Sequence, residues 1–134
     1  MKQIEVWEET EKRKMEKYNI QGMYENYSYP KELDKVIHLN LVDLDIWYLM
    51  TKKQVENRIK GLKERYPERK LIPFAKRDDR DDIACFEIGK VNKVQIIHDF
   101  ASAGYEQRKE YDCFWDWFRD AIDEMIEWDE NNEN

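Results

Sequence analysis

The most regular alternation of apolar and polar positions lies near the C-terminal end of the chain. Between Tyr111 and Trp128 apolar residues recur every three or four positions and, at about 100° per residue, fill one half of a helical wheel. The other half is almost entirely acidic. This pattern predicts an amphipathic helix whose aromatic face packs on a sheet and whose carboxylate face is exposed. The tail at 129–134 is expected to fray.

Three further helices are predicted from shorter patterns. Residues 2–18 carry four apolar side chains at loosely helical spacing: Ile4, Trp7, Met15 and Tyr18. Pro30 suits the first position of a second helix, which Asn40 would end. Its apolar face would consist of Leu33, Val36 and Ile37.

The third of these helices has the clearest start and end. Thr51 and Gln54 have the spacing of a capping box, and Pro67 ends the helix. One apolar face is predicted, formed by Val55, Ile59, Leu62 and Tyr66. The basic residues of this segment would then face water or a partner.

Strands are predicted between and after these helices. Residues 41–50 are β-prone, most clearly at Ile46 to Leu49, and 71–75 and 83–88 form a hairpin through a charged loop. A turn at 89–92 leads to a strand at 94–100. Its residues alternate between two faces, with Val94, Ile96, His98 and Phe100 on one and Gln95, Ile97 and Asp99 on the other.

These elements predict one α+β domain over residues 1–134, with a central, mostly antiparallel sheet packed by helices and an acidic amphipathic helix at the end. A chain of 134 residues is long enough for one core, and a second is not expected. Residues 1–28 would form an N-terminal extension and 128–134 an acidic tail.

Charge is distributed unevenly along this domain. The formal net charge is −7, yet residues 110–134 hold ten acidic residues and one base, Arg119. Residues 51–70 hold eight bases and three acids. The chain therefore combines a basic middle with an acidic end. Its aromatic content of 13% is too high for a disordered chain.

The sequence also predicts a soluble, cytoplasmic protein. The N-terminus lacks the basic and apolar regions of a signal peptide, and no window approaches 18 apolar residues. Cys85 and Cys113 have no metal-binding spacing, and one pair is too few for a disulfide framework. Both are expected to be reduced thiols.

Enzymatic motifs are missing from the sequence. Neither phosphate-binding glycine loops nor nucleophile-elbow or zinc-protease motifs occur, and only His38 and His98 could serve as bases. His98 and Asp99, as neighbours on a strand, point to opposite faces and would not meet directly. We therefore expect a non-enzymatic protein without a cofactor.

The charged loop between the hairpin strands holds four aspartates: Asp78, Asp79, Asp81 and Asp82. Carboxylates are the ligands that divalent cations prefer, but Arg80 sits in the middle, and the glycine and distant glutamate of an EF-hand are missing. A solvated turn is favoured over a metal site, and contact with a partner is the intermediate possibility.

Nucleic acid and membrane are not expected partners. Phosphate contacts come from Lys and Arg, which the 51–66 helix offers. However, the isoelectric point near 5.0 and the acidic C-terminal helix oppose such binding. A solvated basic face is the favoured interpretation.

Five stretches, taken in order, resemble a known family: "YPKELDKVIHLN", "LIPFA", "DDIACFEIG", "KVQIIHDF" and "YDCFWDWFRDAIDEMI". Residues 29–127 are similar to the SUKH superfamily of bacterial immunity proteins, which includes the Smi/Knr-type regulators of fungal cell-wall synthesis. Members usually have a Gly-rich turn after the first of these stretches, where this chain has 40–43, Asn-Leu-Val-Asp. The partner surface near that turn would therefore differ.

The resemblance implies an α+β domain without catalysis that binds and neutralises a cognate bacterial toxin in the cytoplasm. Such toxins are often nucleases, and a basic nuclease domain would suit an acidic surface. The candidate contact residues are the loop aspartates and one helix face: Asp78, Asp79, Asp81 and Asp82, with Asp116, Asp120, Asp123 and Glu127.

Two alternatives stay open. One is a regulatory or scaffold module of the same fold that binds another cellular protein. The other is a metal-dependent hydrolase that uses the aspartate loop and His98. The sequence fits both a monomer and a homodimer paired through a sheet edge.

Overall fold

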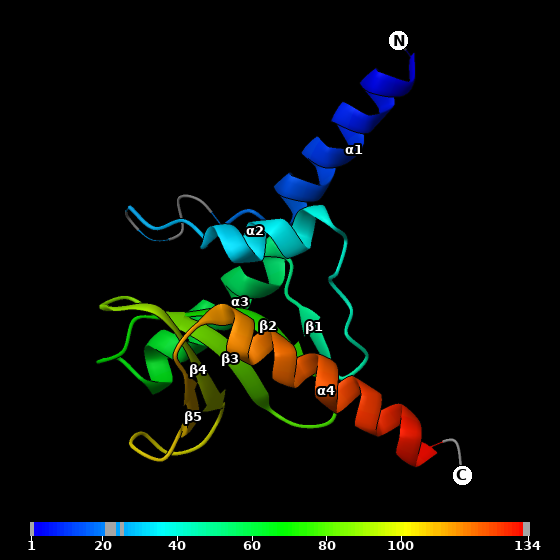
Figure 1. Cartoon of the computed structure of the whole chain (residues 1–134). Helices are drawn as coiled ribbons and strands as arrows, with labels where there is room; N and C mark the ends of the chain where they lie inside the picture. The colour runs from blue at the N-terminus through cyan, green and yellow to red at the C-terminus, as the bar shows by residue number, and fades with distance from the viewer. Residues whose placement is uncertain (1, 21–23, 25, 133–134) are drawn as a thin grey trace.

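Residues 2–20, 24 and 26–132 are described by a computed structural model, which gives the backbone alone for 2–8 and 132. In this part of the chain, four helices surround one sheet of five antiparallel strands that lie in chain order (Figure 1). The helices are α1 (Lys2–Tyr18), α2 (Lys31–His38), α3 (Lys52–Arg65) and α4 (Phe114–Asn132). The strands are β1 (Trp47–Leu49), β2 (Leu71–Arg77), β3 (Asp82–Glu87), β4 (Lys90–His98) and β5 (Gln107–Tyr111). The predicted α+β fold is confirmed.

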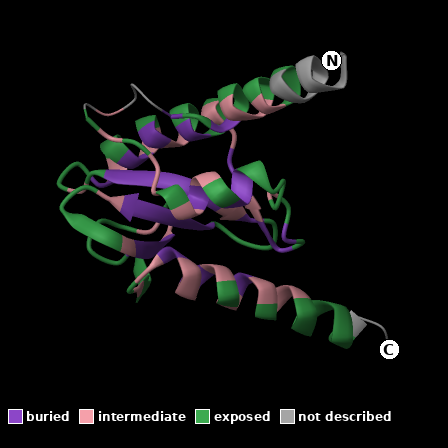
Figure 2. Ribbon diagram, turned by 45° about the horizontal axis from the view of Figure 1, so that its top comes forward, coloured by how far each residue is buried: buried purple, intermediate pink, exposed green. Residues whose placement is uncertain are grey.

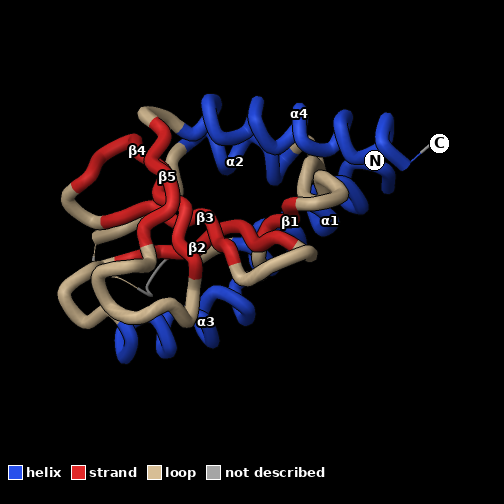
Figure 3. The backbone as a smooth tube through the Cα atoms, turned by 90° about the horizontal axis from the view of Figure 1, so that it is seen from below, coloured by secondary structure: helices blue, strands red, loops and turns tan. Residues whose placement is uncertain are grey.

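The sheet is covered on both faces. Figure 3 shows α3 on one side of the strands and α4 on the other. Strand β4 contributes side chains to the cores on both faces of the sheet. Ile96 packs in the cluster around Trp117, whereas Ile97 packs with Leu62 of α3. The predicted alternation along this strand is therefore confirmed from Val94 to Asp99.

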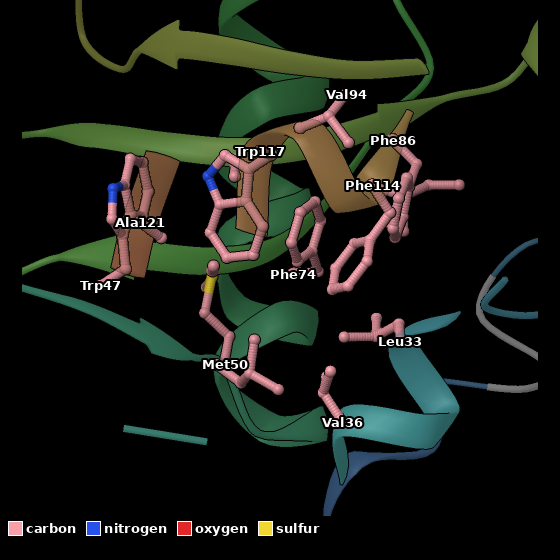
Figure 4. Packing of buried hydrophobic residues seen from close by; sticks show 14 of the residues in the cluster. Leu33, Val36, Trp47, Met50, Phe74, Phe86, Val94, Phe114, Trp117 and Ala121 are labelled. Carbon is pink, nitrogen blue, oxygen red and sulfur yellow. The ribbon is translucent and has the colours of Figure 1, made fainter. Parts of the chain in front are cut away.

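Aromatic side chains hold α4 to the sheet. Trp117 is 1% exposed, and its ring lies 4.9 Å from Phe74 and 5.5 Å from both Trp47 and Phe114 (Figure 4). Ring pairs at such distances stabilise a core beyond the area they bury.

The remainder of the apolar face of α4 is covered less well than predicted. Ala121 is buried, but Ile126 and Trp128 are 46% and 50% exposed, because this half of α4 extends beyond the sheet (Figure 2). The predicted frayed tail is also wrong over its first part, because the helix continues to Asn132.

The N-terminal segment packs on the rest of the domain. Helix α1 is present as predicted and contacts α2 and α3. Tyr18 and Ile20, at its end, are buried in the main core. The side chains of Ile4 and Trp7 lie outside the described part.

The predicted starts of α2 and α3 agree with the structure within one residue. The hydroxyl of Thr51 accepts from the Gln54 amide at 3.3 Å, and the Gln54 side chain accepts from the Thr51 amide at 2.8 Å. Pro30 is the N-cap of α2 rather than its first residue. Asn40 has a φ of 61°, a left-handed conformation that ends a helix.

Several strand boundaries differ from prediction, and the first strand covers only 47–49 of the β-prone stretch 41–50. The charged link between β2 and β3 is only 78–81, because Lys76, Arg77 and Asp82 belong to the strands. Strand β4 starts at Lys90, since a tight turn at 88–89 uses Gly89 with a φ of 96°. Phe100 lies beyond the strand, with a φ of 71° and 61% of its surface exposed.

Strand β5 was not predicted. Its sequence, Gln-Arg-Lys-Glu-Tyr, has no apolar alternation, and four of its five residues are exposed. A charged strand at the edge of a sheet blocks pairing with another chain.

Several bases of the 51–70 segment bind carboxylates of the sheet rather than facing water. Arg58 and Arg65 donate to Asp99, and Arg69 donates to Glu87 and Glu106.

Cys85 and Cys113 are free thiols. Among the described residues, none of the helices has the length and apolar character needed to cross a membrane.

Candidate functional site

A cleft of about 670 Å³ lies between α4 and the strands on the side that α4 covers. Every strand contributes to its wall: Trp47, Arg77, Asp82, Ile96, His98, Arg108, Lys109 and Tyr111, with Arg80 from the β2–β3 link. Helix α4 supplies Asp120, Asp123, Glu124 and Glu127, which share one face because they are spaced three and four residues apart. Five carboxylates and four cations thus meet in one cleft.

The loop end of the cleft is organised around Asp82. Asp82 and His98 are register partners on β3 and β4, and Nδ1 of His98 lies 2.8 Å from the Asp82 carboxylate. Nε of Arg80 forms an ion pair with the other carboxylate oxygen, 2.9 Å away. Because a carboxylate only accepts, Nδ1 is the donor in this pair, and Nε2 is the nitrogen left to meet a ligand.

Arg77 lines the cleft and contacts residues of several elements. Its guanidinium lies 5.4 Å from the ring centre of Trp47, donates to both oxygens of Asp79 and also donates to Glu124. Burial alone would lower the pKa of Arg77, but the hydrogen bonds that it donates to Asp79 and Glu124 outweigh this effect and raise that pKa. The bond from Arg77 lowers the pKa of Asp79.

A third pairing ties β5 to α4. The Tyr111 hydroxyl donates to Asp120 at 2.8 Å, and Lys109 donates to the same oxygen at 3.3 Å. Burial and the bond to Asp120 raise the pKa of Tyr111, which therefore stays protonated as a donor. Asp120 is thus occupied by partners within the protein.

Two carboxylates of the cleft differ from the rest. In the described part of the chain, Asp123 and Glu127 make no hydrogen bond or ion pair, and they lie one helical turn apart on the wall of the cleft. Their exposed oxygens are free to accept from a ligand. A Lys or Arg side chain would satisfy both without disturbing another pair.

The cleft offers groups for binding and one candidate for acid–base chemistry. His98 oriented by Asp82 resembles a general base. However, three of the four cations that could stabilise developing negative charge already pair with carboxylates: Arg77, Arg80 and Lys109. Among the described residues, no group of three or more His, Cys, Asp or Glu could hold a metal ion.

The structure brings together half of the candidate contact residues. Two surfaces that the sequence presents separately meet in the cleft, contributing Asp82 from one and Asp120, Asp123 and Glu127 from the other. Asp79 adjoins them through Arg77. Asp78 and Asp81 are exposed on the link, and Asp116 pairs with Arg119 at 3.1 Å outside the cleft.

Backbone contacts hold the exposed link in place. The Asp78 amide donates to the Ile46 carbonyl at 3.0 Å, and the Asp81 carbonyl accepts from the Asp99 amide at 3.1 Å. The link is thus a turn tied to β1 and to the end of β4. His98 and Asp99 point to opposite faces, as predicted.

Some residues of the cleft were not predicted. Three of them lie on β5 and were missed because that strand was not predicted: Arg108, Lys109 and Tyr111. In the sequence Trp47 looks like an ordinary strand residue and Arg77 like a residue of the charged loop, and no local pattern distinguishes them. For Glu124 the sequence did hold a signal, because its helical spacing placed it on the acidic face of the predicted helix.

Comparisons of the chain with protein-family models, curated proteins and solved structures give no match. The resemblance to the SUKH superfamily accordingly stands on the sequence motifs alone.

Proposed function

We propose that this chain is a non-enzymatic protein-binding domain that neutralises a bacterial toxin by covering the toxin's functional surface. The observation that carries the proposal is the pair of unpartnered carboxylates, Asp123 and Glu127, on the wall of a cleft whose other charges are largely paired. The resemblance of residues 29–127 to bacterial immunity proteins supports it.

The partner would present a basic surface. A Lys or Arg side chain entering the cleft would gain a charge-assisted hydrogen bond at each of the two carboxylates. The excess of acidic residues at 110–134 would steer a basic protein toward this side of the domain. A nuclease domain, which binds phosphates through its own Lys and Arg, has that character.

Rigid walls favour such a role. Arg77, His98 and Lys109 hold Glu124, Asp82 and Asp120 in place, so on binding ordering is needed mainly at Asp123 and Glu127. Inhibition would then follow from occlusion, with no chemical step on the partner.

The test has two stages. The tagged chain captures its partner from the source cells at moderate salt, and the captured protein is identified and assayed. Affinity is then measured for the double variant Asp123→Asn with Glu127→Gln. We expect binding weakened at least about tenfold, mainly through slower association at low salt.

A matched control is available on the same helix. Asp129→Asn with Glu130→Gln changes net charge by the same amount, and both residues are exposed outside the cleft. This control should keep its affinity within about twofold. Equal losses in both double variants would show that total charge, and not the cleft, determines binding.

A regulatory or scaffold module of the same fold would use the same cleft. The captured partner separates the two functions: an adjacent-gene toxin whose activity the chain abolishes supports neutralisation. A housekeeping complex with unchanged activity would refute neutralisation in favour of the module.

A further inference from the structure

A second groove, of about 440 Å³, lies on the opposite face of the sheet, between α3 and the β1–β2 edge. Tyr48 and Lys76 line it and are register partners. Their neighbours Trp47 and Arg77 line the cleft beside α4 described above, which we call the acidic cleft. Since successive residues of a strand point to opposite faces, the two depressions are separated by the thickness of the sheet. We call this second depression the basic groove.

The arginines of the basic groove have donors to spare. Asp99 accepts from Arg58 at 2.7 Å, twice from Arg65 at 2.8 Å and once from the Phe100 amide at 2.8 Å. These four bonds fill the lone pairs of a carboxylate. The two guanidinium groups therefore hold more N–H groups than Asp99 can accept, and both line the groove.

Lys76 adds a third cation. It is half-buried, and within the described residues its ammonium group has no carboxylate partner. In the part of the chain that the structure describes, the groove is thus lined by three cations and no carboxylate; Asp99 pairs with two of the cations, and the charge of Asp78 also reaches Tyr48, so the basic groove keeps a net positive charge.

The position of Arg65 depends on a glycine. A Cβ atom at Gly61 would lie 2.6 Å from Nη2 and 2.7 Å from Nη1 of Arg65, so a larger residue would push the guanidinium away. Gly61 itself lines the basic groove. The absence of a side chain here lets the guanidinium lie across α3 in one position, between Asp99 and the ring of Phe100, 4.3 Å away.

The remaining lining is suited to an organic molecule rather than to a bare ion. Met50 and the ring of Tyr48 supply apolar surface, and the amides of Gln54 and Asn57 supply polar groups at the rim. The volume falls within the range of roughly 300–1,000 Å³ that small-molecule sites occupy.

We propose that the basic groove binds a small phosphate monoester, with the phosphate on Arg58, Arg65 and Lys76 and the organic part on Tyr48 and Met50. A monoester carries nearly two negative charges at neutral pH and three acceptor oxygens for the three cations, whereas a carboxylate offers one charge and two oxygens. Guanidinium groups match phosphate oxygens in geometry as well as charge. This inference does not depend on the proposed toxin-binding function, because it concerns the other face of the sheet.

Calorimetric titration of the whole chain provides the test. The probes are adenosine 5′-monophosphate and glucose 6-phosphate, with adenosine as the probe that lacks phosphate. We expect at least one monoester to bind and adenosine not to bind; the tighter monoester indicates whether nucleotides or sugar phosphates are the source. Failure of both monoesters, or equal binding of adenosine, would overturn the proposal.

Two lysine variants then test whether the monoester binds in the basic groove. Lys76→Met keeps the apolar stem and removes the charge, and it should weaken monoester binding about tenfold. Lys60→Met removes a charge from an exposed position of α3 outside the groove and should leave binding within about twofold. Equal affinities of the two variants would refute this site. The Asp123→Asn and Glu127→Gln variant should bind the monoester normally, so that failure at one face is distinguishable from failure at the other.

Discussion

Arg65 donates two hydrogen bonds to Asp99, through Nε and Nη2, each 2.8 Å long. With the bond from Arg58, they fasten the end of β4 to α3 across 34 and 41 residues of sequence. Asp99 is 1% exposed, so water does not compete. Burial alone would raise the pKa of Asp99, but the bonds from Arg65 and Arg58 outweigh it and hold that pKa below its ordinary value.

Asp99→Asn should therefore lower the free energy of unfolding at pH 7. Two arginines would lose their counter-charge at a largely buried site, at a cost of about 2–4 kcal/mol, measured by urea denaturation. A depressed carboxyl pKa stabilises the folded state above the ordinary Asp pKa of roughly 4, and this contribution is lost as the pH falls through the folded-state value. The difference between wild type and variant should accordingly shrink below about pH 4. A difference that stays constant down to low pH would contradict the ionic role of Asp99.

The effect of Gly61→Ala on the free energy of unfolding should depend on whether Arg65 is present. Alanine favours a helix over glycine by about 1 kcal/mol. In the wild type, however, the new methyl group would displace Arg65 from Asp99, and we expect net destabilisation of about 1–2 kcal/mol. In an Arg65→Ala background the same substitution should stabilise the protein by about 1 kcal/mol, because no guanidinium is displaced. Stabilisation in both backgrounds would show that Arg65 finds an equivalent position.

Trp117→Ala should be among the most damaging changes in α4. The indole contacts three other aromatic rings of the core and is 1% exposed, so its removal leaves a cavity and costs about 3–5 kcal/mol. Ile126→Ala, two to three turns further along and 46% exposed, should cost about 0.5 kcal/mol or less. Chemical denaturation of the two variants compares them directly. Similar losses would mean that the distal half of α4 is covered in solution, for example by another chain.

The two thiols should react at very different rates. Cys85 has no exposed surface, and burial raises the pKa of its thiol well above the ordinary value. Cys113 is half-buried at the start of α4. Under native conditions N-ethylmaleimide should add once, at Cys113, and the second addition should follow the rate of unfolding. Mass spectrometry counts the additions, and the Cys113→Ser variant should show none before unfolding.

Local patterns of the sequence predicted those elements whose causes are local. The capping box at Thr51 depends on residues three positions apart, and the periodicity of α4 on neighbours three and four apart. Strand β5 has no such signal, because its place is decided by the free edge of β4 rather than by apolar residues of its own. The sequence therefore assigned Tyr111 to the helix that follows.

The acidic cleft was predicted in pieces. Spacing placed Asp123 and Glu127 on one face, and the charged run singled out Asp82, but sequence spacing does not tell that residues 41 or more positions apart line one space. Charge counting also treated Arg and Lys alike over 51–70. In the structure the planar guanidinium groups of Arg58 and Arg65 pair with a buried carboxylate, whereas Lys60 and Lys63 remain exposed.

The attachment of α4 has a consequence for how such a domain diversifies. Phe114, Trp117 and Ala121 account for its fully buried positions in the described part of the helix, and they lie on a different side from Asp123 and Glu127. Mutations of Asp123 and Glu127 would therefore alter the surface proposed to meet a partner, at little cost to folding. A lineage could exchange one partner for another by changing a few exposed acids while the aromatic anchor stays the same.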